Sequence, residues 1–128
     1  MGTKGTILLV EDEAPARIAL QELLEARGYR VLPACGGVEA LVRLRDEETP
    51  DLIISDLVMG LMSGWELSER QQVDYRLAEI PVILVSGVPE LPFHAEALNA
   101  AACFSKPVDL DELVDAIETA LHREPVAA

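Results

Sequence analysis

Leu52-Ile53-Ile54-Ser55-Asp56 is the most informative segment for the fold class, because an unbroken aliphatic run ends in a single carboxylate. Strands that are covered by helices on both faces form continuous apolar runs, without alternation of apolar and polar residues. Similar short runs recur along the chain, and we assign five strands to residues 6–10, 29–34, 51–55, 80–85 and 102–105. The sequence therefore predicts a parallel sheet built from βα units.

Amphipathic stretches separate these runs, as expected for the helices of such a sheet. We predict helices at 15–27, from about 38 to near Thr49-Pro50, at 65–74, at 93–101, and after Asp109, which stands at an N-cap position. The apolar faces predicted for the first, second and last helices are Ala16, Leu20, Leu23 and Leu24; Val38, Leu41 and Val42; and Leu110, Leu113, Val114, Ile117 and Leu121. We expect residues 1–128 to form a single domain with a core at about 5–123.

Composition and charge exclude several classes of function. The 128 residues include 10 basic and 23 acidic side chains, which give a formal charge of −13. This charge repels nucleic-acid phosphates and anionic membrane surfaces, so we expect no direct nucleic-acid or membrane partner. The apolar runs are too short to cross a bilayer and the N-terminus has no signal layout, so we expect a cytoplasmic location. Cys35 and Cys103 are the only cysteines, and we expect both to be buried, reduced thiols.

Polar side chains stand at the ends of four of the five predicted strands. Glu11-Asp12, Asp56, Ser86 and Lys106-Pro107 each follow an apolar run. The carboxyl ends of parallel strands meet at the crevice where ligands bind, so these residues are expected to share one site. Three carboxylates there would repel one another without a cation, and Mg²⁺ suits a few carboxylates, a carbonyl and waters.

The same site has the chemistry to hold a phosphoryl group. Lys106 supplies a positive charge for a phosphoryl dianion, and the Ser86 hydroxyl can donate a hydrogen bond to it. A carboxylate between a metal and a lysine can attack phosphorus and hold the group as an acyl phosphate. Asp56 stands alone at the end of the central strand, so it is the best candidate for the nucleophile.

Four motifs in this order resemble the receiver domain of response regulators, the switch module of two-component signalling. They are Leu9-Val10-Glu11-Asp12-Glu13, Asp56-Leu57-Val58-Met59 with Met62-Ser63-Gly64, Ser86-Gly87 and Lys106-Pro107. The resemblance implies an α/β fold of the flavodoxin-like type: a doubly wound, five-stranded parallel sheet of order 2-1-3-4-5 with helices on both faces. It further implies a cis peptide bond before Pro107.

The resemblance also implies roles for individual residues. Asp56 would be the phosphoacceptor, with Ser86 and Lys106 contacting the phosphate. Mg²⁺, or Mn²⁺ in its place, would be bound by Asp56, directly by Asp12, through water by Glu11, and by the backbone carbonyl of Val58. The phosphate would come from a histidine kinase, a phosphotransfer protein or a small phosphodonor.

As a phosphoprotein, such a domain signals by changing the face that a downstream protein effector contacts. We expect a monomer or weak homodimer, and no enzyme activity beyond the domain's own phosphorylation and dephosphorylation. The chain could be a stand-alone regulator or a receiver excised from a hybrid histidine kinase.

Two positions depart from the family's pattern. Gly60 stands in Met59-Gly60-Leu61 where receivers usually have proline, which suggests a looser loop beside the acceptor. Cys103, followed by Phe104, stands three residues before Lys106, where the family commonly has an aromatic switch residue. The interpretation that the chain is a pseudo-receiver, an interaction module that works without phosphate, is therefore an alternative. A phosphohydrolase of the haloacid dehalogenase type is the other alternative, although Val58 occupies the place of its second aspartate.

Overall fold

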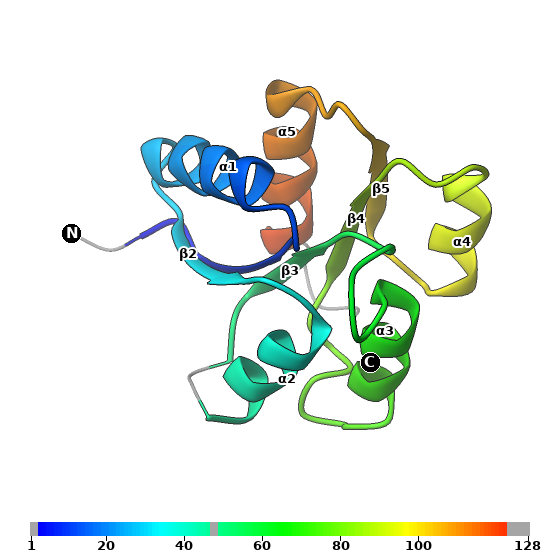
Figure 1. Ribbon diagram of the computed structural model, residues 1–128. Helices are drawn as coiled ribbons and strands as arrows, with labels where there is room; N and C mark the ends of the chain where they lie inside the picture. Colours follow the sequence, from blue (N-terminus) through cyan, green and yellow to red (C-terminus); the bar gives the residue numbers. More distant parts are fainter. Residues whose placement is uncertain (1–2, 47–48, 123–128) are drawn as a thin grey trace.

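The strand order predicted from the resemblance is confirmed by the computed structural model, which describes residues 3–46 and 49–122. Five parallel strands lie in the order β2-β1-β3-β4-β5 (Figure 1). The strands are β1 Thr6–Val10, β2 Arg30–Ala34, β3 Leu52–Ser55, β4 Val82–Ser86 and β5 Ala102–Ser105. The helices are α1 Ala14–Ala26, α2 Gly37–Asp46, α3 Gly64–Gln72, α4 Leu91–Ala97 and α5 Leu110–Leu121.

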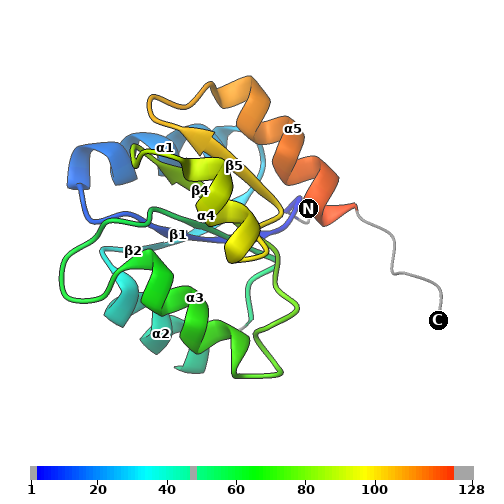
Figure 2. The same ribbon diagram turned by 90° about the vertical axis from the view of Figure 1, so that its right-hand side faces the viewer.

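The sheet is covered on both faces, which explains why its strands carry continuous apolar runs. Successive side chains of β1 point to opposite faces: Ile7 and Leu9 pack toward α1 and α5, and Leu8 and Val10 toward α2 and α3. Figure 2 shows α1 and α5 on one side of the sheet and α2 and α3 on the other. Leu91 and Ala95 of α4 join a third cluster with Leu84 of β4.

The predicted apolar face of the second helix is wrong at two of its three positions. Val38 and Val42 are each 49% exposed. Gly37 begins this helix in close contact with Met62, because a Cβ at Gly37 would lie 2.8 Å from the Met62 side chain. The residues that reach the core follow at the spacing of one helical face and are Ala40, Leu41 and Leu44.

Several element boundaries also differ from the predicted ones. The fourth helix was predicted at 93–101 but spans Leu91–Ala97, because Pro92 suits the first turn and Asn99 adopts a left-handed φ of 57° just beyond the end. The fourth strand runs to Ser86, one residue further than predicted, and begins after Pro81. The other boundaries differ by a few residues, as is usual for frayed ends. Leu23 of the predicted first helical face is half-exposed. The prediction that both cysteines are buried is wrong for Cys35, which is exposed because β2 ends at Ala34, and Cys103 is only partly buried.

The last helix, α5, lies close to the C-terminal limit of the described residues. Asp109 caps α5 as predicted, because its Oδ1 accepts a hydrogen bond from Glu112 N at 3.0 Å. Residue 123, the predicted limit of the core, and residues 1–2 and 124–128 lie outside the described residues, so the single-domain assignment stays a prediction. Within the described ranges, no helix has the length and apolar character that a membrane span needs.

Candidate functional site

The ends of four strands meet at one edge of the sheet, as the sequence predicts. Asp56 N donates to Val10 O at 3.2 Å, which places the residue after β3 beside the last residue of β1. Lys106 N donates to Ser86 O at 3.1 Å, which places the residue after β5 beside the last residue of β4. Glu11, Asp56, Ser86 and Lys106 therefore come together although they are far apart in the sequence.

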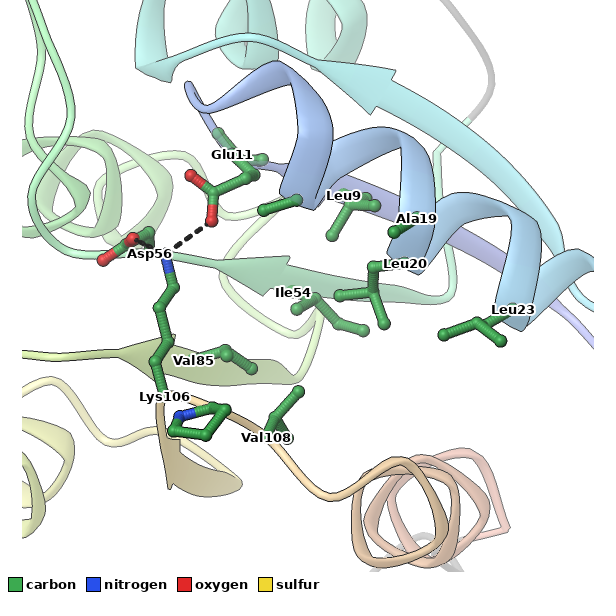
Figure 3. Close-up of a pocket in the computed structure, with 13 residues that line it drawn as sticks. Leu9, Glu11, Ala19, Leu20, Leu23, Ile54, Asp56, Val85, Lys106 and Val108 are labelled. Atoms are coloured by element: carbon green, nitrogen blue, oxygen red, sulfur yellow. Dashed lines mark hydrogen bonds and ion pairs between the residues drawn. The ribbon is translucent and has the colours of Figure 1, made fainter.

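Lys106 bridges two buried carboxylates at this edge. Its Nζ lies 2.6 Å from Glu11 Oε1 and 2.6 Å from Asp56 Oδ2 (Figure 3). Both carboxylates are buried, whereas the lysine side chain is 34% exposed and reaches them from the rim. Charge-assisted hydrogen bonds of this length are stronger than neutral ones, so the ammonium compensates much of the cost of burying two negative charges.

The Asp56 carboxylate is held on both oxygens. Oδ1 accepts hydrogen bonds from Leu57 N at 2.6 Å and Val58 N at 3.2 Å, while Oδ2 accepts from Lys106. Burial by itself would raise the pKa of Asp56, but the hydrogen bond from Lys106 and the other donors around it outweigh burial and lower that pKa below its ordinary value. The Asp56 side chain is therefore an ionised carboxylate at neutral pH.

The pKa of Lys106 is shifted in the complementary direction. Burial by itself would lower it, but the hydrogen bonds to Asp56 and Glu11 raise it above its ordinary value. The lysine thus keeps its proton and its charge while it bridges the two carboxylates.

Ser86 lies at the end of β4 and is almost completely buried, at 1% exposure. Its Oγ is near enough to Asp56 to help lower the carboxyl pKa, but it meets no atom of the described residues in the geometry of a hydrogen bond. A buried hydroxyl without a partner costs free energy, so a ligand oxygen next to Asp56 would satisfy it.

The two acidic residues after β1 lie in different surroundings. Glu11 points into the site and is held at three points: Oε1 by Lys106, Oε2 by Glu13 N at 3.1 Å, and its carbonyl oxygen by Arg17 Nη1 at 2.9 Å. Asp12 is exposed beside it. Arg17 was not predicted as a site residue, because its only signal in the sequence was a basic side chain on the first helical turns next to an acidic pair.

The donor chemistry of the site suits an oxygen-liganded cation such as Mg²⁺. The Lys106 ammonium lies between carboxylate oxygens of Glu11 and Asp56, which shows that the pocket stabilises positive charge at this point. Within residues 3–46 and 49–122, no three acidic, His or Cys side chains lie close enough together to form a metal cluster. Mg²⁺ needs only one or two carboxylates when waters and a phosphate complete its shell, so the residues present fit this ion.

Other residues singled out in the sequence fall at the margin of the site. The Lys106-Pro107 peptide bond is cis, which confirms the expectation. Val58 is 60% exposed on the loop after Asp56. Cys103 packs on the cluster around α4, and Phe104 packs on the opposite face with α5, so Phe104 does not replace an aromatic at position 103.

An apolar cavity of about 480 Å³ adjoins the charged residues under α1. Figure 3 shows Leu9, Leu20, Ile54 and Val85 along this cavity, with Glu11, Asp56 and Lys106 at one end. Leu23 borders it, which accounts for the exposure of that side chain. The sequence analysis did not predict this cavity, because the small side chains Ala16 and Ala19 of α1 reveal a gap only once the helix is placed over the sheet.

The bridge formed by Lys106 gives a measurable prediction. Lys106→Met is expected to raise the apparent pKa of Asp56 in metal-free solution, because the burial remains while the main group that lowers this pKa is removed. An NMR titration of the Asp56 side-chain carboxyl carbon measures it. Lys4→Met, at a lysine over the Tyr29 ring, is the matched control and should leave this titration unchanged. Equal Asp56 titrations in Lys106→Met and wild type would show that the bridge is absent in solution.

Comparison with known proteins identifies the family. The family model described as the response regulator receiver domain matches residues 7–118, nearly the whole chain. The chain belongs to this family. Receiver domains interact with histidine kinases and phosphotransfer proteins, and they generally bind Mg²⁺ for phosphorylation.

Individual relatives support the same conclusion. This receiver domain is 31% identical to Sporulation initiation phosphotransferase F of Bacillus subtilis over 88% of its own length and 90% of that protein. A response regulator receiver protein from Pseudomonas putida has the same fold, with a TM-score of 0.84, 30% identity and coverage of 93% of this chain and 99% of that one. Histidine kinase P4 of Formosa agariphila is 38% identical over 85% of this chain, which spans only 8% of the kinase. The chain also spans 57% of a probable transcriptional regulator, ycf29 of Porphyra purpurea, to which it is 34% identical over 92% of this chain.

Proposed function

We propose that this receiver domain accepts a phosphoryl group on Asp56 from the phosphohistidine of a histidine kinase or phosphotransfer protein. The observation that carries the proposal is the Asp56 carboxylate, which is buried, ionised and held between two backbone N–H groups and the Lys106 ammonium. Asp56 Oδ2 attacks the phosphorus, a P–O bond forms as the P–N bond breaks, and the electron pair leaves with the imidazole. The product is an acyl phosphate.

The neighbouring side chains fit the charge of that product. Lys106 pairs with a phosphoryl oxygen once the group is attached, and the unpartnered Ser86 hydroxyl donates to another. Glu11, Asp12, Asp56 and the Val58 carbonyl are the groups that would hold Mg²⁺. When bound, this ion supplies positive charge that neutralises the phosphoryl oxygens as the group is transferred.

On this proposal the chain is a signalling switch without turnover of external substrates. Its downstream partner is a protein effector, and it acts in the cytoplasm as a monomer or weak homodimer. The strongly acidic surface, with a formal charge of −13, is consistent with protein partners and unsuited to direct contact with nucleic acid.

Incubation with a small phosphodonor tests this function. The wild-type intact mass is expected to increase by one phosphoryl group when Mg²⁺ is present, and to stay unchanged when a chelator replaces Mg²⁺. A mass that does not change in either condition would contradict phosphoryl acceptance and favour a pseudo-receiver. Steady release of phosphate from free phosphoesters would instead revive the phosphohydrolase alternative.

A further inference from the structure

The start of α3 is pressed against the backbone of the phosphoacceptor. A Cβ at Gly64 would overlap Asp56 O and approach Leu57 Cα at 2.7 Å, and Gly64 N donates to Leu57 O at 2.8 Å. Tightly packed contacts do not deform continuously, so a change in the backbone at Asp56 and Leu57 must displace the first residues of α3.

Trp65 is the next residue and reaches from α3 to α4. Its Nε1 donates a hydrogen bond to His94 Nδ1 at 3.3 Å. The two rings meet edge to face with centroids 5.2 Å apart. Among the described residues, no other hydrogen bond joins α3 to α4. The indole–imidazole pair is thus the specific polar connection between the two helices.

The apolar surroundings reinforce this connection. Trp65 packs on the cluster formed by buried Leu57, Leu84, Leu91 and Ala95. Leu57 directly follows the phosphoacceptor, and Leu91 and Ala95 belong to α4. The cluster therefore extends from the residue next to Asp56 to α4. Cys103 contributes only a small thiol here, which leaves Trp65 as the aromatic side chain of the cluster.

Helix α4 is a weakly held element whose position can follow such a contact. It spans Leu91–Ala97, a length of 7 residues. Glu90 at its N-cap adopts a left-handed conformation with φ 56° and makes no side-chain cap hydrogen bond. A short, poorly capped helix has little intrinsic stability and depends on tertiary packing.

We propose that the Trp65–His94 pair couples the state of Asp56 to the position of α4, and that it supplies the aromatic link which Cys103 cannot. This inference rests on the proposed function, because the signal at Asp56 is the phosphoryl group. Phosphorylation changes the hydrogen bonds that Asp56 Oδ1 accepts from Leu57 N and Val58 N. The resulting shift passes through Gly64 to Trp65, and Trp65 carries it to His94.

The test measures α4 directly by amide hydrogen exchange of residues 93–97, before and after treatment with phosphodonor and Mg²⁺. Trp65→Phe keeps an aromatic ring but removes the donor, and His94→Phe keeps a ring but removes the acceptor. In both variants the unphosphorylated α4 amides are expected to exchange about 2- to 10-fold faster than in wild type, the effect of losing one hydrogen bond. The phosphorylation-induced change in α4 exchange should be reduced by a similar factor, while the intact mass still shows normal labelling. Far-UV circular dichroism checks that both variants are folded.

His94→Asn is the rescue variant, because its side-chain oxygen can accept the indole N–H, and it should restore most of the α4 protection. Trp65 is the only tryptophan in the sequence, so its emission reports the same contact in wild type and His94→Asn. If Trp65→Phe and His94→Phe leave α4 exchange as in wild type, the coupling is overturned. Failure of the proposed function is seen in a different measurement, because the intact mass of the wild type would then not increase. In that case the difference in α4 exchange between the unphosphorylated wild type and the unphosphorylated variants still shows whether the Trp65–His94 pair stabilises α4.

Discussion

Asp56→Asn is expected to abolish labelling by a small phosphodonor, with no mass increase under conditions in which the wild type gains one phosphoryl group. The amide has neither the negative charge nor the nucleophilic oxygen that attacks phosphorus. It also leaves Lys106 with Glu11 as its single carboxylate partner, so the ammonium is held more weakly. Intact-mass spectrometry in the presence of Mg²⁺ measures the label.

Asp51→Asn is the matched control for this variant, because Asp51 precedes the same strand at its opposite end. Asp51 Oδ2 accepts a hydrogen bond from Thr6 N at 2.8 Å, and an asparagine oxygen can take over that role. The control should fold and be labelled like the wild type. A label that persists in Asp56→Asn would assign phosphoryl acceptance to another side chain, and a label lost equally in both variants would point to a general effect on folding.

Gly64→Ala is expected to produce the second large effect, on both stability and phosphorylation. The added methyl group would overlap the carbonyl oxygen of Asp56, which is backbone and cannot rotate away. Overpacking of this kind costs about 1–3 kcal/mol of unfolding free energy, measured by urea denaturation. Phosphorylation should slow by on the order of 10- to 100-fold, because displacement of a reacting group by an ångström has an effect of that size.

Gly60→Ala is the control for this prediction, because Gly60 lies in the loop that leads into α3. An added Cβ there would meet no atom within 4 Å, and the φ of Gly60 is not in the left-handed region. Stability and labelling should stay near the wild-type values. Equal losses in Gly60→Ala and Gly64→Ala would contradict the close approach at Gly64 and would support the looser loop suggested by the sequence.

Gly60 and Gly64 show which structural roles of a glycine can be predicted from its neighbours in the sequence. Gly60 attracted notice because proline is usual at its position, yet its conformation does not require glycine. Gly64 lies within a motif, but the reason for it is a contact with Asp56 eight residues earlier, and this contact exists only after the loop has closed. The same holds for Gly37, whose close neighbour Met62 comes from the loop between β3 and α3.

Residue types and their spacing along the chain were enough to predict a parallel sheet and the polar residues at one of its edges. Five continuous apolar runs predict five covered strands, and the polar residues after them predict that Glu11, Asp56, Ser86 and Lys106 converge. These features depend on short-range periodicity and on the rule that parallel strands align their carboxyl ends. The strand order came from the resemblance to a family, because periodicity carries no information about which strands are neighbours.

The contacts between individual side chains became known from the folded molecule alone. It places the Lys106 ammonium between Glu11 and Asp56, leaves Asp12 exposed and Ser86 without a partner, and brings Trp65 against His94. Contacts between residues distant along the chain depend on helix rotation and on close packing. The spacing of apolar positions in the sequence carries no information about either. The chemistry of the site could therefore be predicted from residue types, while the contacts that link the site to α4 required the packed molecule.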